Sequence, residues 1–181
     1  MQVIATDIAD VLILQPRSFG DERGYFFESF NARVFREATG LTREFIQDNH
    51  SRSVKNVLRG LHYQLRHPQG KLVRVVAGAV FDVAVDLRRS SATFGRWTGA
   101  FLSADNKRQM WVPEGFAHGF LVLSDTADFL YKTTDYWRSE DEHTIVWNDA
   151  DLGIAWPRHD VPALSKKDAD GKSFKNAEVF A

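Results

Sequence analysis

Cysteine is absent from this sequence of 181 residues. Its absence excludes a scaffold held by disulfides, catalysis by a thiol and metal sites built from thiolates. Long apolar runs are missing as well, because no stretch approaches the roughly 18 consecutive apolar residues that a membrane-spanning helix needs. We therefore expect a globular protein that binds no membrane and whose core is stabilised by packing alone.

The chain also has almost no net charge, since 23 Lys and Arg residues face 24 Asp and Glu residues. It lacks the basic field by which nucleic-acid-binding proteins usually attract their ligand, so an anionic ligand must be met by a local cluster of cations. The opening segment, MQVIATDIADVLIL, has no basic region before its apolar residues and is typical of a first strand, not of a signal peptide. We expect a cytoplasmic protein that binds no nucleic acid.

Short strand-like runs make up most of the sequence. They are rich in Val, Phe, Tyr, Trp and Leu, and they cover residues 56–64, 70–87, 96–103, 108–124 and 127–137. Turn-forming clusters separate them, and the composition never shifts enough to mark a domain boundary. The pattern predicts one mainly β domain over residues 1–181, an antiparallel sandwich or barrel.

Helices are predicted at two places only. The segment NARVFREATG predicts a short helix, with Asn31 as its N-cap and Gly40 just beyond its end. A C-terminal helical extension is expected from about residue 162. There, Ser165 and Asp168 have the S-x-x-D spacing of a capping box, and on spacing alone Asp168 is interpreted as a capping residue.

Strand alternation predicts where the side chains point. Along residues 57–64, Arg59 faces one side of the strand and His62 the other, unless a bulge intervenes. Along residues 79–87, one face is apolar and the other carries Asp82 and Asp86. A barrel with a polar interior would use such a face.

The segment VPEGFAHGF fits the pattern P-x-G-x-x-H, the second signature of the cupin barrels, and delivers His118 to a strand. In metal-binding cupins the first signature supplies two histidines one residue apart and then a carboxylate. Here that signature reads His62-Tyr63-Gln64 and is followed, beyond a turn, by Lys71. Two histidines can form a weak metal site, but a lysine repels a divalent cation. We therefore expect a cavity without a metal.

A neutral histidine and a lysine without a metal suit proton abstraction next to a carbonyl. Imidazole is the usual general base near neutral pH, and an ammonium group stabilises the oxygen of an enolate. Inversion also needs an acid on the opposite face of the carbon, and Tyr131 is a donor of the right type. Taken singly, His62, Lys71 and Tyr131 are more often structural: a satisfied strand histidine, a lysine that reaches solvent and a packed aromatic.

Cations and aromatic residues that an anionic nucleotide would need are scattered along the chain. The cations are Arg23, Arg59 and Lys167. The aromatic residues in polar surroundings, where stacking on a base is an alternative to packing, are Phe19, Tyr136 and Trp137.

Several separated segments, read together, closely resemble the dTDP-4-dehydrorhamnose 3,5-epimerases, the cofactor-independent cupin-type enzymes of dTDP-L-rhamnose synthesis. They are FGDERGYFFESF, QDNHSRS, LRGLHYQ, QGKLVRV, PEGFAHGF and EHTIVWNDADLGIAWP, and the similarity runs in order from about residue 2 to residue 176. The resemblance implies a cupin-type antiparallel β-sandwich or jelly-roll barrel with a few short helices.

The resemblance also implies a set of catalytic residues. His62 is the general base, Asp168 orients and polarises it, Tyr131 is the proton donor on the opposite face, and Lys71 stabilises the enolate at the sugar 4-oxygen. No metal and no cofactor is implied. The role implied for Asp168 replaces the simple capping interpretation.

Substrate contacts are implied in the same way, to a dTDP-4-keto-6-deoxyhexose. The sugar would be contacted by His118, and the diphosphate and substrate would be held by Arg23, Arg59 and Lys167. Polar contacts to nucleotide and sugar would come from Glu28, Gln47, Asn49 and Glu142. The thymine would be flanked by Phe19 and Tyr136. The resemblance further implies a homodimer, in which an N-terminal segment of one subunit helps to complete the site of the other.

Other functions remain open on sequence alone. A relative that inverts only carbon 3 or only carbon 5 of another dTDP-deoxysugar would use the same base and acid. A metal-dependent cupin, such as a dioxygenase or isomerase, is suggested by His62 and His118 but opposed by Lys71. A sugar-nucleotide binder without activity would gain nothing from His62, Asp168 and Tyr131 together, and a ketoisomerase on the same barrel is a further alternative.

Overall fold

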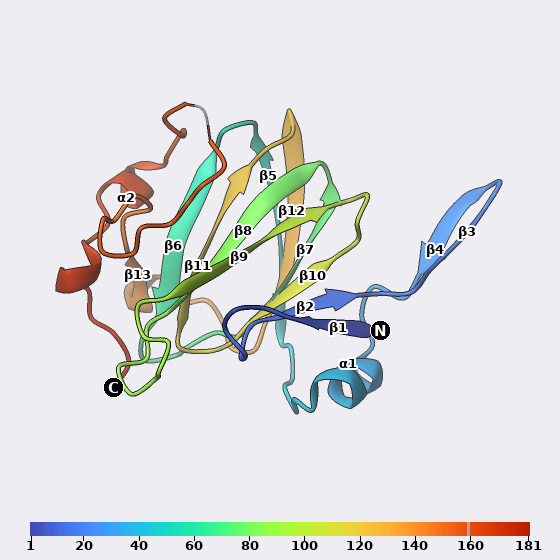
Figure 1. Ribbon diagram of the computed structural model, residues 1–181, viewed down its shortest axis with the longest axis horizontal. Helices are drawn as coiled ribbons and strands as arrows, with labels where there is room; N and C mark the ends of the chain where they lie inside the picture. Colours follow the sequence, from blue (N-terminus) through green and yellow to red (C-terminus); the bar gives the residue numbers. More distant parts are fainter. Residues whose placement is uncertain (159) are drawn as a thin grey trace.

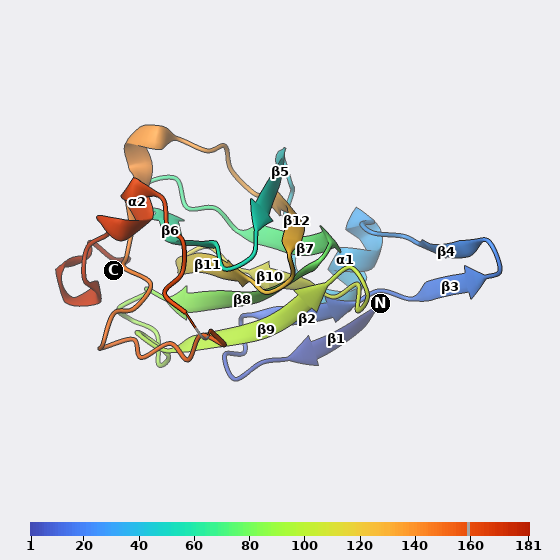
Figure 2. The same ribbon diagram turned by 90° about the horizontal axis from the view of Figure 1, so that it is seen from above.

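The computed structural model describes residues 1–158 and 160–181 and confirms a mainly β, antiparallel fold. One sheet has six strands in the spatial order β1 (Gln2–Ala5), β2 (Leu12–Gln15), β10 (Gln109–Val112), β7 (Lys71–Ala77), β12 (Thr126–Thr133) and β5 (Gln47–Val54). The other has five, in the order β13 (Glu142–Thr144), β6 (Leu58–Gln64), β11 (Phe116–Val122), β8 (Ala79–Asp86) and β9 (Trp97–Ser103). The two sheets form the sandwich seen in Figures 1 and 2.

Three smaller parts surround the sandwich. A hairpin of β3 (Ser18–Asp21) and β4 (Gly24–Phe27) projects away from it, as Figure 1 shows. Helix α1 (Ala32–Thr39) has Asn31 as its N-cap and ends at Gly40, as predicted. The C-terminal segment carries α2 (Lys166–Ala169) and the 3-10 turn η2 (Phe174–Asn176), while the 3-10 turn η1 (Ser139–Asp141) leads into β13. No helix in the described part of the chain is long and apolar enough to cross a membrane.

Three hydrophobic clusters follow from the alternation of side chains on the two sheets. The inner cluster lies between the sheets and includes Val73, Ala84, Met110 and Phe129. A second cluster joins the outer face of the five-stranded sheet to the C-terminal segment. The third packs α1, through the buried Phe35, on the six-stranded sheet. Helix α1 and the C-terminal segment thus each cover part of the outer face of one sheet.

Strand β8 follows the predicted alternation without a break. The side chains of Phe81, Val83, Val85 and Leu87 all join the outer cluster, and Asp82 turns to the inside of the sandwich. Burial of this carboxylate is complete. The polar face read from the sequence is therefore part of the interior wall.

Strand β6 departs from alternation through a bulge, the exception that the sequence left open, so Arg59 and His62 do not leave opposite faces of the strand. His118 of β11 pairs with His62, and Phe120 pairs with Arg59, so two residues of β6, Gly60 and Leu61, lie opposite one residue of β11. The extra residue is a bulge that reverses the alternation. Gly60 permits it, since a Cβ there would lie 2.6 Å from the Cα of Gly119. Arg59 and His62 consequently face the same cavity.

Candidate active site

A cavity of about 360 Å³ opens between the two sheets. Its walls hold most of the residues that the sequence resemblance singled out. These are Gln47, Asn49, Arg59, His62, Lys71, His118, Tyr131, Glu142 and Lys167. The walls come from both sheets and from α2, so a ligand in the cavity touches both layers of the fold.

His62 is paired with the carboxylate of Asp168, which lies behind it. The two side chains meet at 2.5 Å between His62 Nε2 and Asp168 Oδ1. Burial raises the pKa of Asp168, but its bonds to His62 and Ser165 and the charge of Lys167 outweigh this and leave the pKa below its usual value. An ionised carboxylate only accepts, so Nε2 carries the proton and Nδ1 keeps its lone pair. Nδ1 is therefore the basic atom of His62.

Asp168 belongs to the N-terminal cap of α2 and also bonds to His62. Ser165 is the N-cap of α2, because its Oγ accepts a hydrogen bond from the backbone N–H of Asp168. The same hydroxyl donates to Asp168 Oδ2 at 2.7 Å. The cap thus holds the carboxylate with one oxygen fixed and the other aimed at His62.

Glu142 lies on the other side of His62. Its Oε1 is 4.0 Å from His62 Nδ1, and its Oε2 accepts a hydrogen bond from Lys167 Nζ at 2.9 Å. Burial raises the pKa of Glu142. The effects of Lys167, His62 and the side chain of Trp137 lower it by more, so the pKa ends below its usual value and the group stays ionised. A carboxylate beside Nδ1 stabilises the imidazolium that forms when His62 takes a proton.

Lys71 occupies the buried end of the cavity. Burial lowers its pKa from 10.5 to about 8, while the charges of Glu142 and Asp82 oppose the shift. Its Nζ donates to the backbone oxygen of His62 at 3.4 Å, a long contact that leaves the remaining protons free. A buried ammonium without a close carboxylate is well suited to an oxyanion that forms during a reaction.

Asp82 and His118 form a second buried pair beneath the cavity. His118 Nε2 lies 3.0 Å from both carboxylate oxygens of Asp82. Burial raises the pKa of Asp82, and His118 and Lys71 oppose the rise. Asp82 fixes the ring of His118, which lines the cavity. The sequence pattern found this carboxylate on a polar face but gave no reason to connect it with His118.

Tyr131 faces His62 from the other sheet. It lies on β12 of the six-stranded sheet, whereas His62 lies on β6 of the five-stranded sheet, and both side chains line the same cavity. Burial raises the pKa of Tyr131, Glu142 adds to the rise, and Arg59 opposes it. The phenol is thus held in its protonated form, as a proton donor requires.

Four of the residues singled out from the sequence lie apart from this cavity in the single chain. Phe19 and Arg23 are on the projecting hairpin, where Arg23 pairs with Asp21 at 2.5 Å. Glu28 accepts a hydrogen bond from the N-cap Asn31. Tyr136 has 56% of its surface exposed and does not line the cavity.

The structure adds five residues to the walls of the cavity. They are Ser51, Gln69, Phe120, Phe129 and Trp137. Ser51 could have been found from Gln47 and Asn49 by period-two alternation along β5. Trp137 was noticed only as an aromatic residue in polar surroundings. The others carry no local signal, because only the packing of the two sheets brings them to the cavity.

Metal-binding geometry is not found in the described residues 1–158 and 160–181. No three His, Cys, Asp or Glu side chains converge there as ligands would. Gln64 stands where the metal-binding signature has its second histidine. Its side chain is buried and bonds to backbone groups of two loops.

Known proteins resemble this chain over almost its whole length. The family model for dTDP-4-dehydrorhamnose 3,5-epimerase matches residues 5–176. The chain belongs to this family. A dTDP-4-dehydrorhamnose 3,5-epimerase of Pseudomonas aeruginosa is 62% identical over 180 residues, which is 99% of each chain. One from Methanothermobacter thermautotrophicus is 50% identical, over 98% of this chain and 96% of that one.

Solved structures of the family match the fold closely. A 3,5-epimerase of Legionella pneumophila in complex with dTDP-4-keto-L-rhamnose superposes with a TM-score of 0.95 at 54% identity, over 98% of this chain and 94% of that one. A 3'-monoepimerase of Streptomyces bikiniensis in complex with dTDP-quinovose superposes with 0.88 at 34% identity, over 97% and 88%. The cupin-type sandwich of the dTDP-4-dehydrorhamnose 3,5-epimerases is thus confirmed as the fold of this chain.

Proposed function

We propose that this chain is the isomerase that inverts carbons 3 and 5 of dTDP-4-dehydro-6-deoxy-D-glucose to give dTDP-4-dehydro-L-rhamnose, in dTDP-L-rhamnose biosynthesis. The observation that carries the proposal is the placement of His62 and Tyr131 on opposite walls of one cavity, with Lys71 at its buried end. Inversion at carbon needs a base on one face and an acid on the other.

The chemistry is a proton transfer in which every electron pair is accounted for. The ketone at carbon 4 acidifies the hydrogens on carbons 3 and 5. His62 Nδ1 takes one of these protons, the C–H pair becomes a carbon–carbon double bond, and the carbonyl π pair moves to the 4-oxygen. The Lys71 ammonium stabilises this enolate oxygen. Return of the electron pair, with a proton from Tyr131 on the opposite face, restores the ketone in inverted configuration.

His62 then releases its proton to solvent and Tyr131 regains one. The cycle leaves the oxidation state of the sugar unchanged, so no redox cofactor is needed. Asp168 and Glu142 stabilise the imidazolium in the interval, because one carboxylate bonds to Nε2 and the other lies 4.0 Å from Nδ1. We expect Arg59 and Lys167 to hold the diphosphate and His118 the sugar, with Gln47 and Asn49 as polar contacts.

We also propose that the active form is a homodimer whose sites are shared. The hairpin supports this, because it projects from the sandwich with Phe19, Tyr25 and Phe26 exposed by 52%, 61% and 72%. Exposed aromatic residues beside Arg23 suit a partner's nucleotide site better than solvent. We expect Phe19, Arg23 and Glu28 of one subunit to reach the cavity of its partner. Phe19 and Tyr136 would flank the thymine. The cytoplasmic location expected from the sequence remains a prediction.

Mixed subunits test the shared site. Arg23→Ala and His62→Ala proteins should each be nearly inactive, since each lacks one half of every site. After co-refolding, half of the dimers are mixed and each mixed dimer has one intact site, so activity should return to about a quarter of the wild-type value. No recovery would show that each subunit supplies its own Arg23, and an active Arg23→Ala protein would show that the site does not use this residue.

Proton exchange tests the reaction itself. The protein is incubated with dTDP-4-keto-6-deoxy-D-glucose in deuterated water and the sugar ring is followed by NMR. Deuterium should enter at carbons 3 and 5 with wild-type protein and with His50→Ala, whose ring lies outside the cavity, but not with His62→Ala. Exchange at a single carbon would identify a mono-epimerase, which the similarity to the 3'-monoepimerase makes the second candidate. No exchange would refute the enolate mechanism.

A further inference from the structure

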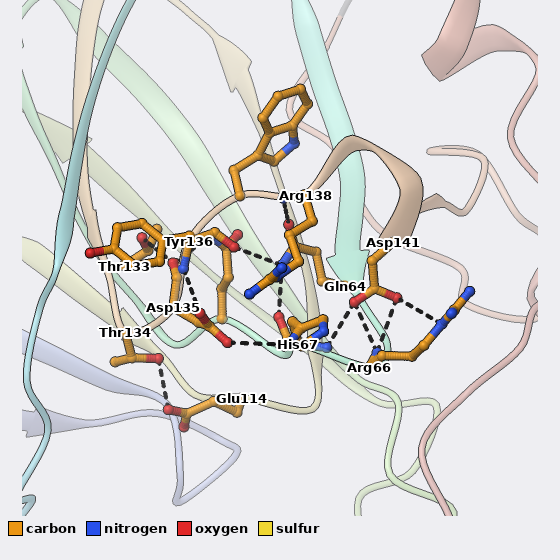
Figure 3. A network of polar contacts seen from close by, with 12 residues as sticks. Gln64, Arg66, His67, Glu114, Thr133, Thr134, Asp135, Tyr136, Arg138 and Asp141 are labelled. Carbon is orange, nitrogen blue, oxygen red and sulfur yellow. Dashed lines mark hydrogen bonds and ion pairs between the residues drawn. The ribbon is translucent and has the colours of Figure 1, made fainter.

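Two loops cross between the sheets at the mouth of the cavity, and neither supplies a group to the proton transfers proposed above. Residues 65–70 connect β6 to β7, and residues 134–141 connect β12 to β13. The second loop carries Trp137, which lines the cavity, and leads directly into Glu142. Figure 3 shows the polar network that joins the two loops.

Gln64, the last residue of β6, lies at the centre of this network. Its amide nitrogen donates to the backbone oxygens of His67 at 2.7 Å and Tyr136 at 3.2 Å. Its amide oxygen accepts from the backbone N–H of Arg138 at 2.7 Å. The side chain is 3% exposed. Both amide hydrogens and the oxygen are therefore used, and the bonds hold the residues on either side of Trp137.

Trp137 is held from a third direction as well. Its own backbone N–H donates to Gln47 Oε1 at 3.0 Å. At the far end of the loop, the buried carboxylate of Asp141 accepts from the backbone N–H groups of Arg66 and His67. The loop is thus fixed before and after Trp137, although 55% of the surface of this side chain is exposed.

Only an amide satisfies all three partners of Gln64. A histidine, which metal-binding cupins have at this point of the signature, has two ring nitrogens and cannot donate to two carbonyl groups while accepting from an N–H. A glutamate would turn a negative oxygen toward two carbonyl oxygens. The residue that breaks the metal signature is therefore the one that the loop requires.

We propose that Gln64 is a positioning residue that holds Trp137 against the nucleotide end of the substrate and so sets the affinity for dTDP. The direction of the cavity supports this. Lys71 and His118 are 7% exposed at the inner end, where the sugar reacts, whereas Trp137 is half exposed at the mouth. The nucleotide must extend outward from the reacting sugar. This inference rests on the proposed function and deepens it.

The test combines Gln64→Glu, which is isosteric, with Gln64→Asn, a milder change that keeps an amide but is too short for all three bonds. Ser124→Ala is the matched control. It removes hydrogen bonds to Ala79 and Thr126 in the turn at the other end of β12, far from the cavity. Binding of dTDP is measured by calorimetry, substrate turnover by NMR and loop order by amide hydrogen exchange.

We expect both Gln64 variants to speed exchange in residues 134–141 by about tenfold or more, and to raise the Kd for dTDP and the KM by about tenfold while kcat changes little. In Trp137→Ala protein, adding Gln64→Glu should raise the Kd no further, because Gln64 acts through Trp137. Ser124→Ala should leave exchange in residues 134–141 and the Kd unchanged.

Unchanged exchange in residues 134–141 would overturn the positioning role, and faster exchange with an unchanged Kd would overturn the link to the nucleotide. An equal loss in Ser124→Ala would show a general effect of stability. Hydrogen exchange and the Kd for dTDP can be measured without turnover. A wild-type protein that binds dTDP but does not epimerise would therefore refute the proposed reaction and leave this test intact.

Discussion

Replacement of Lys71 by methionine should separate catalysis from stability. Burial of the ammonium lowers its pKa from 10.5 to about 8, which corresponds to roughly 3 kcal/mol of unfavourable desolvation. Methionine has a similar shape and no charge, so Lys71→Met should raise the free energy of unfolding by about 1–3 kcal/mol at pH 7. On the proposed mechanism the same change removes the group that stabilises the enolate, so kcat should fall by about 10²–10³.

The pH dependence gives a second readout with a definite sign. A lysine with this pKa is about nine-tenths protonated at pH 7 and about one-tenth protonated at pH 9. The activity of wild-type protein should fall above pH 8, about tenfold per unit, because the neutral amine cannot stabilise the enolate. Tyr131 does not cause this fall, since its pKa is raised above 10.0. The residual activity of Lys71→Met should lack the decline near pH 8.

Stability follows the opposite course. The unfolded chain keeps the lysine protonated up to about pH 10.5, whereas the folded protein releases the proton near pH 8, so the free energy of unfolding rises with pH between these values. Urea unfolding and initial rates across pH 6–10 measure both effects, with exposed Lys55→Met as the control. A wild-type profile that is flat to pH 10, or a Lys71→Met protein that is both less active and less stable, would refute the reasoning.

Three further changes follow from the site. Asp168→Asn should lower kcat by about 10²–10⁴, because the amide no longer fixes the tautomer of His62. Ser165→Ala should mainly lower the free energy of unfolding, by about 1 kcal/mol, through the lost cap. Equal losses of kcat in the two variants would contradict a separate role for the carboxylate. Tyr131→Phe should still exchange deuterium into the sugar but form little inverted product, and undiminished inversion by NMR would assign the acid elsewhere. Gly119→Ala should lower the free energy of unfolding by about 1–3 kcal/mol, because its Cβ would lie 2.7 Å from the backbone oxygen of Arg59. An unchanged midpoint in urea unfolding would show that β6 shifts to accommodate the methyl group.

The fold was predictable where local signals agree with the packing. Alternation in β8 and the capping residues Asn31 and Gly40 of α1 predicted what the structure shows. The predicted strand over residues 70–87 proved to be two strands, since Gly78 turns the chain between β7 and β8 with a φ of +75°. Strand β5 was not predicted, because QDNHSRSV is polar on both faces. Its inner face is the cavity wall, and there polarity serves a ligand instead of solvent.

Residues far apart in sequence limit what can be predicted of the site. The amide of Gln64 and the carboxylate of Asp168 each act on groups that only the folded chain brings near. The distance along the chain from His62 to Asp168 is 106 residues. The bulge at Gly60 was an open alternative, and it decides whether Arg59 and His62 share a cavity. The role of Asp168 was assigned from the family resemblance alone, because composition and spacing do not reveal such contacts, and Gln64 was given no role.

The late position of Asp168 in the chain has a consequence for synthesis. Every strand of both sheets is complete by Thr144, whereas the partner of His62 lies on a segment that follows. During synthesis all strands of both sheets are therefore made before the carboxylate that bonds to His62, and before the segment that covers the outer face of the five-stranded sheet. On the proposed mechanism, a chain that stops before α2 lacks both the carboxylate partner of His62 and the cavity cation Lys167, so we expect it to be inactive and to bind the sugar nucleotide more weakly.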